Sequence, residues 1–117
     1  MTYYNDRRVD AELEEAIELT REALAEEGFG VLAEIDVTEK MKEKLGLEEF
    51  RDYRILGACN PPLANEGLEN EINLGVLLPC NVVVYVDDDG ETVVSAVDPS
   101  AMLSVVDNPE MDAIAEE

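Results

Sequence analysis

Apolar positions at three- and four-residue spacing predict a long helix over residues 10–27. These positions share one helical face, whereas the opposite face is almost entirely glutamate. The apolar face consists of Leu13, Ala16, Ile17, Thr20, Ala23 and Leu24. We expect Asp10 to cap the first turn of this helix and Gly28 to end it.

Alternating apolar positions predict two strands in the first half of the chain, at residues 29–37 and 53–58. Between them, residues 38–45 have the pattern of a short helix that Gly46 ends. The sequence therefore predicts that helices and strands alternate up to residue 58.

The second half of the chain is richer in apolar runs. We expect a short apolar strand at residues 73–78, a break at residues 79–81, and a fully apolar strand at residues 82–86. Three aspartates and Gly90 then predict a turn, from which residues 91–97 return as a hairpin partner.

A capping residue followed by proline occurs three times, at Asn60-Pro61, Asp98-Pro99 and Asn108-Pro109. Proline at the first helical position loses no hydrogen bond, so each pair predicts the start of a helix. The predicted order is αβαβαβββα, with residues 1–117 forming a single domain. We expect an α+β fold of two layers, a mostly antiparallel sheet with helices packed on one face.

The charge restricts the classes of partner. The chain has 29 acidic and 8 basic residues, a formal net charge of −21. Such a surface repels nucleic-acid phosphates and anionic membranes, so we expect neither partner. Scarce lysine together with many acids favours a halophilic protein, because high salt screens self-repulsion. An acidic face that binds a protein partner is the alternative.

Missing residue types exclude several kinds of site. The chain has no histidine, which excludes a Ser-His-Asp triad, a Cys-His pair and histidine metal ligands. Two cysteines are too few for a typical structural zinc site, so no metal site is assigned. Whether the protein is an enzyme stays open, and no cofactor is identified.

Localisation is predicted from the hydropathy pattern. The first fifteen residues are polar and lack the apolar core of a signal peptide. The longest apolar run, residues 74–86, is interrupted and too short to cross a bilayer. We expect a cytoplasmic protein whose two cysteines are mostly reduced.

Two Cys-Asn dipeptides, Cys59-Asn60 and Cys80-Asn81, are the main candidates for chemistry. Cys59 directly precedes a predicted helix cap, and a helix N-terminus favours the thiolate over the thiol. Cys59 would then be a nucleophile, a redox thiol or a ligand for a soft metal. The alternative is that each cysteine is a small, buried apolar residue.

Two other charged groups have simpler interpretations. Asp87, Asp88 and Asp89 lack the alternate spacing and twelfth-position glutamate of a calcium loop, so a hairpin turn is the better interpretation. Five cations close in sequence are candidates for a basic patch but are better explained as surface ion pairs. These cations are Lys40, Lys42, Lys44, Arg51 and Arg54.

Four blocks, GFGVLAEIDVTEKMKEKLG, YRILGACNP, LGVLLPCNVVVY and VDPSAML, are similar to the family called domain of unknown function 302. The resemblance extends from about Leu13 to Ala115, and ACNP and LLPCNVVV are its most specific parts. It implies a small α/β sandwich of TATA-binding-protein-like architecture and a tendency to form homodimers. It does not imply DNA binding, because fold is not function. The family's recurring positions map to Phe29, Gly57, Cys59, Asn60, Pro61, Pro79, Cys80, Asn81, Asp98 and Pro99.

The chain departs from that family in its acidity and in a weak first strand near Tyr3 and Tyr4. Neither departure touches the Cys-Asn blocks. The resemblance implies no established activity, but it draws attention to a cleft at those blocks.

Two hypotheses for the function remain. In the first, Cys59, Asn60, Cys80 and Asn81 form a site for a small ligand, a soft metal such as copper(I), or thiol redox chemistry. In the second, the chain is a non-catalytic dimeric module with structural cysteines. That module would act by dimerisation or by binding a small apolar ligand between sheet and helices.

Overall fold

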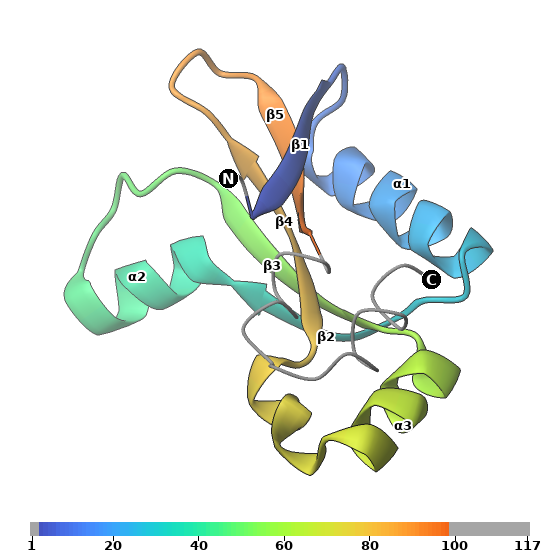
Figure 1. The fold of residues 1–117 in the computed structure, drawn as a ribbon. Helices are drawn as coiled ribbons and strands as arrows, with labels where there is room; N and C mark the ends of the chain where they lie inside the picture. The colour runs from blue at the N-terminus through green and yellow to red at the C-terminus, as the bar shows by residue number, and fades with distance from the viewer. Residues whose placement is uncertain (1–2, 99–117) are drawn as a thin grey trace.

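The computed structural model describes residues 3–98, which form a five-stranded antiparallel sheet with helices (Figure 1). The α+β prediction is confirmed. In chain order the elements are β1 (Tyr4–Val9), α1 (Leu13–Glu26), β2 (Gly30–Asp36), α2 (Val37–Leu45), β3 (Tyr53–Cys59), α3 (Pro61–Asn70), the 3₁₀ helix η1 (Ile72–Leu77), β4 (Cys80–Val86) and β5 (Thr92–Val97).

The strands lie in the order β1-β5-β4-β3-β2, so β1 and β2 form the two edges. Along β3 and β4 the register runs from Tyr53 opposite Tyr85 to Ala58 opposite Cys80. Strands β4 and β5 form the predicted hairpin, and β1 pairs along the outer side of β5. Because side chains alternate along a strand, this register decides which residues share each face of the sheet.

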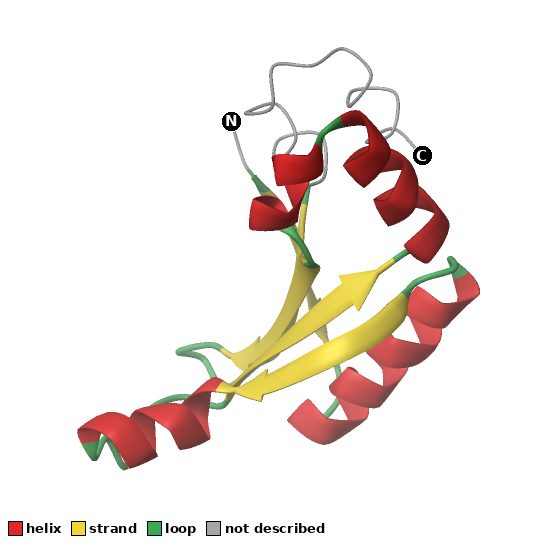
Figure 2. Cartoon of the chain, turned by 90° about the horizontal axis from the view of Figure 1, so that it is seen from below, coloured by secondary structure: helices red, strands yellow, loops and turns green. Residues whose placement is uncertain are grey.

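Helix α1 packs across one face of the sheet, as Figure 2 shows from below. Its buried residues Ala16 and Ile17 contact a central cluster of Leu56, Val82 and Val84. Leu56 and Val84 have no exposed surface. Burying such side chains contributes about 1.5–3 kcal/mol each, so this cluster is the main source of stability in the described part.

The helix boundaries follow local signals in the sequence. Gly28 and Gly46 adopt positive φ angles of 85° and 69° where α1 and α2 end, as predicted. The Asn60 side chain accepts a hydrogen bond of 3.3 Å from the backbone N–H of Leu63 at the start of α3. The helices predicted after Asp98-Pro99 and Asn108-Pro109, at residues 99–106 and 109–115, lie outside the described residues.

Two sequence predictions of secondary structure are wrong. Residues 73–78 were expected to form a strand but lie mostly in η1, where Leu74 packs on Gly67 of α3. The apolar run therefore supports a helix–helix contact. The predicted order also omits β1, because an edge strand with mostly exposed, polar side chains has no apolar alternation.

Asp10 does not cap α1, which is also a correction. The N-cap is Glu12, which makes no side-chain capping bond. The hydroxyl of Thr92 donates a 2.7 Å hydrogen bond to the carbonyl of Ala11. This bond ties the link between β1 and α1 to β5, so the helix begins two residues later than the cap signal predicts.

Candidate functional site

The two Cys-Asn blocks meet at one end of the sheet. Cys59 is the last residue of β3 and Cys80 the first of β4, and these strands are neighbours. Ala58 lies directly opposite Cys80, so Cys59 is offset from Cys80 by one residue. The fold therefore brings together two dipeptides that are 21 positions apart in the chain.

The two thiols nevertheless belong to different faces of the sheet. Cys80 shares its face with its partner Ala58, which is the face that α1 covers. Cys59 is one residue further along β3, so its side chain alternates to the opposite face. Both cysteines are half-buried and free of a disulfide. The two cysteines are therefore close in the backbone, but their side chains point to opposite faces of the sheet.

Electrostatics at Cys80 favours the neutral thiol. Burial raises the pKa of the Cys80 thiol above its usual value, and the nearby Cys59 raises it further. A raised pKa lowers the fraction of reactive thiolate at neutral pH. Cys80 therefore has the environment of an inert thiol.

The two asparagines and Pro79 have separate roles. Asn60 caps α3 with its side-chain oxygen, as described above. Asn81 is exposed and lies opposite Gly57 of β3. The ring of Pro79, which precedes Cys80, packs over Gly57. Each of these contacts explains a residue of the Cys-Asn blocks by a turn, a cap or a packing contact.

Metal-binding geometry is not present elsewhere in the described chain. Among residues 3–98, no three Cys, Asp or Glu side chains come together in a way that would hold a metal ion. Asp87 of the acidic turn instead accepts backbone hydrogen bonds of 2.9 Å from both Asp89 and Glu91. These N–H donors hold the pKa of the Asp87 carboxyl below its usual value, and Arg8 lowers it further. The interpretation of this segment as a hairpin turn is confirmed.

The cations named in the sequence analysis are mostly paired with acids, as expected. Lys40 and Lys42 lie 3.7 Å from Glu43 and 4.0 Å from Glu48, respectively. Arg51 pairs with Asp88 at 2.6 Å. Arg54 binds three carboxylates, and these belong to Glu14, Glu34 and Asp36. A free basic patch is therefore not formed by these residues.

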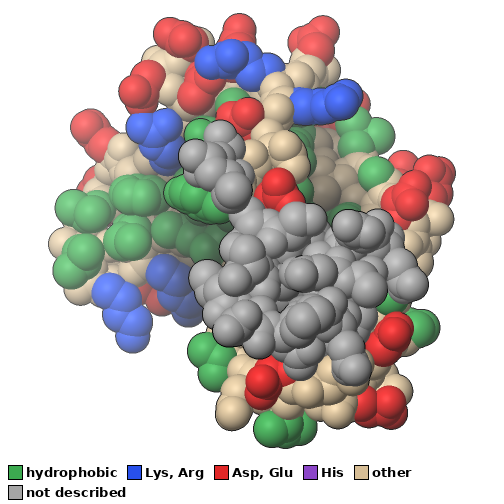
Figure 3. All heavy atoms as spheres, viewed as in Figure 1, with side chains coloured by type: hydrophobic (Ala, Val, Ile, Leu, Met, Phe, Trp, Pro, Cys, Tyr) green, Lys and Arg blue, Asp and Glu red, His purple; other side chains and the backbone are tan. Residues whose placement is uncertain are grey.

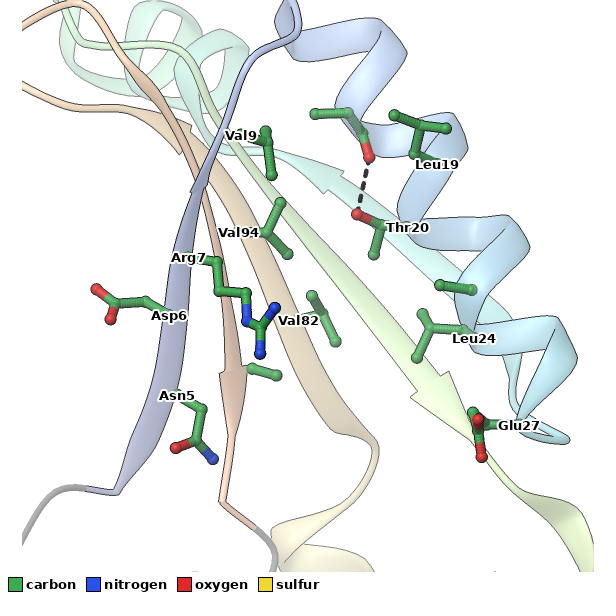
Figure 4. A pocket seen from close by; sticks show the side chains of 13 residues that line it. Asn5, Asp6, Arg7, Val9, Leu19, Thr20, Leu24, Glu27, Val82 and Val94 are labelled. Atoms are coloured by element: carbon green, nitrogen blue, oxygen red, sulfur yellow. Dashed lines mark hydrogen bonds between the residues drawn. The ribbon is translucent and has the colours of Figure 1, made fainter.

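A second candidate site is an apolar groove between α1 and β1 (Figure 4). Helix α1 approaches β2, β4 and β5 most closely, so the edge strand β1 forms a separate wall beside it. Val82, Val94 and Ala96 of the sheet lie between the two walls, and the groove, which is open to solvent, has a volume of about 490 Å³. This volume lies within the range of roughly 300–1,000 Å³ that is usual for small-molecule sites.

The walls of the groove differ in character. The α1 wall presents mostly apolar side chains. Its members are Ala16, Leu19, Thr20, Ala23, Leu24 and Glu27. The Thr20 hydroxyl donates a 2.7 Å hydrogen bond to the Ala16 carbonyl (Figure 4), so it is already satisfied. The β1 wall presents Asn5, Arg7 and Val9 toward the groove, because alternate residues of a strand share a face.

The sequence offers an apolar ligand between sheet and helices as one alternative, but it does not locate this groove. The apolar face of α1 was predicted, whereas the strand of the other wall was indicated only weakly, near Tyr3 and Tyr4, and left out of the predicted order. The positions of that strand that face the groove, Asn5, Arg7 and Val9, show no apolar pattern, since two of the three are polar. The groove becomes visible only when β1 is placed beside β5.

Within residues 3–98, none of the helices is long and apolar enough to cross a bilayer.

Comparisons with known proteins agree with the fold. The family model described as "Domain of unknown function DUF302" matches residues 5–117. A solved structure with a similar fold is the crystal structure of an uncharacterized conserved DUF302 protein from Bacillus stearothermophilus. It is 34% identical, has a TM-score of 0.91, and the match covers 99% of this chain and 89% of that one. None of the curated proteins compared with the chain matches it. The chain belongs to the DUF302 family.

Proposed function

We propose that this protein is a non-catalytic binding module that holds a small ligand with an apolar chain in the groove between α1 and β1. The observation that carries the proposal is the apolar lining of that groove. Val82, Val94 and Ala96 supply the sheet side, and Ala23 and Leu24 supply the helix side. An apolar ligand there would remove these side chains from water, which is favourable in proportion to the area covered.

Three observations at the Cys-Asn blocks support a structural role for them. The thiols of Cys59 and Cys80 lie on opposite faces of the sheet by their register. Burial raises the pKa of Cys80. The side-chain oxygen of Asn60 caps α3 by accepting a hydrogen bond from the Leu63 N–H. These features match a module in which both cysteines pack and both asparagines shape the chain.

A titration with 1-decanol tests the proposal, with heat or amide chemical shifts as the readout. We expect saturable binding to the full chain, and loss of at least about tenfold in affinity for Ala23→Phe, which fills the groove. Ala25→Phe is the matched control, since Ala25 is exposed on the same helix but does not line the groove. Equal binding by all three proteins, or no binding at all, would overturn the proposal.

The thiol hypothesis has one supporting observation, so it stands as a second candidate. Cys59 lies close enough to Cys80 to raise the pKa of the Cys80 thiol beyond the effect of burial. A soft metal or a redox group at Cys59, Asn60, Cys80 and Asn81 would need both sulfurs on one side of the sheet. Titration of copper(I) into wild-type and Cys59→Ser protein distinguishes the cases. Tight binding that Cys59→Ser abolishes would favour the thiol site over the groove.

We also propose that the domain forms a homodimer. The support is an exposed apolar surface on β2, α2 and the following turn, which includes Ile35, Leu45 and Leu47. In the view of Figure 3, apolar side chains gather on the side of the molecule where α2 lies in Figure 1. Such patches on soluble proteins often mark contacts with a partner. Light scattering of wild-type and Ile35→Asp protein tests this, and an unchanged monomer mass in both would overturn it.

A cytoplasmic location is part of the same proposal. Cys59 and Cys80 are both free, which fits a reducing compartment.

A further inference from the structure

The arginines of the chain differ in how they are neutralised. Arg8 pairs with Asp87 and Glu91, Arg21 with Glu34, and Arg51 with Asp88. Arg54 binds three carboxylates. Of the five arginines in the chain, Arg7 alone has no ion pair or side-chain hydrogen bond with any residue in the described range 3–98.

An unpaired arginine is unexpected in this protein. Acids outnumber bases by 29 to 8, so a guanidinium on the surface has many carboxylates available. Arg7 follows Asp6 in β1, but the two side chains point to opposite faces of the sheet. Figure 4 shows Arg7 reaching from β1 over the groove toward Val82, while Asp6 points away from it.

The surroundings of Arg7 are apolar. Arg7 lies opposite Val94 in the β1–β5 register, and Asn5 lies opposite Ala96. Among the described residues that line the groove, Arg7 is the only cation. A guanidinium beside this apolar groove is suited to bind a ligand that has an anionic group at one end of an apolar chain.

We infer that the groove binds a single-chain aliphatic carboxylate, with the carboxylate on the Arg7 guanidinium and the chain along Val82, Val94 and Leu24. The inference rests on the proposed function and adds the chemical class of the ligand. A carboxylate forms two parallel hydrogen bonds with a guanidinium. One methylene buried in the groove contributes about 0.8 kcal/mol, which corresponds to about a fourfold change in affinity.

Charge balance favours a carboxylate over a phosphate head. Among the described residues, one cation, Arg7, and the acidic residue Glu27 line the groove, while the Asp6 side chain points away from it. A dianionic phosphate would leave one charge unpaired among acids, whereas a monoanion is neutralised by Arg7 alone. The net charge of −21 acts in the same direction over the whole surface.

The test compares decanoate, 1-decanol and decyl phosphate as probes, using the full chain at neutral pH and one fixed salt concentration. We expect decanoate to bind about tenfold more tightly than decanol, because the charged hydrogen bonds to Arg7 are added to the same chain contacts. Octanoate should bind about sixteenfold more weakly than decanoate, for two methylenes removed. Equal or tighter binding of decyl phosphate than of decanoate would overturn the choice of a carboxylate.

Variants of Arg7 distinguish the contribution of the ligand's carboxylate from that of its alkyl chain. Arg7→Met keeps an apolar stem and should lower the affinity for decanoate to that for decanol, with decanol itself unchanged. Arg7→Lys should recover part of the difference. Arg8→Met is the matched control, because Arg8 is the next residue but lies on the opposite face and is paired with Asp87. It should leave the binding of both probes unchanged.

The outcomes distinguish this inference from the proposed function. If Ala23→Phe blocks both probes but Arg7→Met affects neither, the groove binds apolar ligands and the carboxylate inference is wrong. If neither probe binds wild-type protein, both proposals fail. Two further results would also overturn the inference. One is decanoate-induced shifts of amides outside α1, β1, β4 and β5, and the other is a change from dimer to monomer in Ala23→Phe, which would make a second copy of the chain the occupant.

Discussion

Pro79 lies so close over Gly57 that a β-carbon at position 57 would come within 2.9 Å of the proline Cγ. Gly57 belongs to β3, and Pro79 immediately precedes β4, so the contact joins the two strands where the Cys-Asn blocks meet. The same β-carbon would be 3.6 Å from Cβ of Ala33 in β2. The glycine thus allows three neighbouring segments to approach one another.

Gly57→Ala should therefore destabilise the domain by about 1–3 kcal/mol, the usual effect of adding a methyl group to a closely packed site. Denaturant unfolding followed by circular dichroism measures the change. Gly30→Ala is the matched control, because it also lies in a strand but has no atom within 4 Å of the added carbon. Equal stability of the two variants would contradict the packing role of Pro79.

Cys80 should react slowly with alkylating agents. Burial raises its thiol pKa, and the neighbouring Cys59 raises it further, so less thiolate is present at a given pH than in a free cysteine. In a Cys59→Ser background, where burial remains as the main cause of the raised Cys80 pKa, we expect alkylation at pH 8 to be at least about tenfold slower than for a small free thiol of pKa about 8.5. The rate should keep rising above pH 9. A plateau below pH 8 would mean that Cys80 is an activated thiol.

Arg54 should be the most important charged side chain for stability. Its side chain is 17% exposed, and the guanidinium lies 2.6 Å from Glu14, 2.8 Å from Glu34 and 3.3 Å from Asp36. Although partial burial alone would lower its pKa, the three carboxylates raise the Arg54 pKa overall. Arg54→Met would leave these carboxylates facing one another and should cost about 2 kcal/mol.

A double-mutant cycle with Glu14→Gln measures how much of that loss comes from one pair. Arg51→Met is the control, because Arg51 and its partner Asp88 are far more exposed. It should change stability by less than about 1 kcal/mol. A smaller loss for Arg54→Met than for Arg51→Met would contradict the importance of the Arg54 cluster.

How far the sequence predicts this fold depends on the strength of each local signal. Gly46 and Asn60 mark helix boundaries, because a left-handed end and a capped start have specific chemical requirements. The hairpin of β4 and β5 was predicted because its apolar strands flank a turn-forming segment. Strand β1 was indicated only weakly and left out of the predicted order, since an edge strand takes its hydrogen bonds from β5 and needs no apolar pattern of its own.

The candidate sites were also harder to predict than local features such as helix ends. Cys59 and Cys80 lie close together because β3 pairs with β4, and their spacing in the sequence does not reveal that pairing. The sequence also does not show that Arg7 lies beside an apolar groove, because the opposite wall of that groove belongs to α1, from Ala16 onward. Sites made of contacts between distant segments need the register before they can be recognised.

Asp87 should stabilise the β4–β5 turn in a pH-dependent way. The backbone N–H of Glu91 chiefly lowers the Asp87 pKa, and the N–H of Asp89 and the Arg8 side chain lower it further. A carboxyl whose pKa is lowered on folding stabilises the native state above its unfolded pKa, about 3.9. This stabilisation is lost as the pH falls through the folded pKa.

Asp87→Asn should therefore be less stable than wild type at pH 6 to 7, and the difference should shrink as the solution is acidified toward and below pH 4. Urea unfolding over a pH series gives the difference directly. Asp89→Asn is the control, because the Asp89 backbone N–H that donates to Asp87 is retained in that variant. A difference that stays constant with pH would show that the Asp87 charge is not the stabilising group.

The net charge of −21 predicts that added salt stabilises the protein. Repulsion among carboxylates opposes the compact state, and the screening length falls from about 10 Å at 0.1 M to about 3 Å at 1 M salt. We expect the free energy of unfolding to rise over this range. Replacing Glu15, Glu18 and Glu22 with glutamine should reproduce part of the gain at low salt, by about 1 kcal/mol in total. These three side chains are exposed on α1.

Glu43→Gln is the matched control, because Glu43 pairs with Lys40 at 3.7 Å and its loss removes an attraction as well as a charge. The triple variant should also gain less from salt than wild type, since fewer charges remain to be screened. If wild-type stability is the same at 0.1 and 1 M salt, the acidic surface is not an adaptation to salt. The charge would then favour the alternative interpretation, a face that binds a partner of opposite charge.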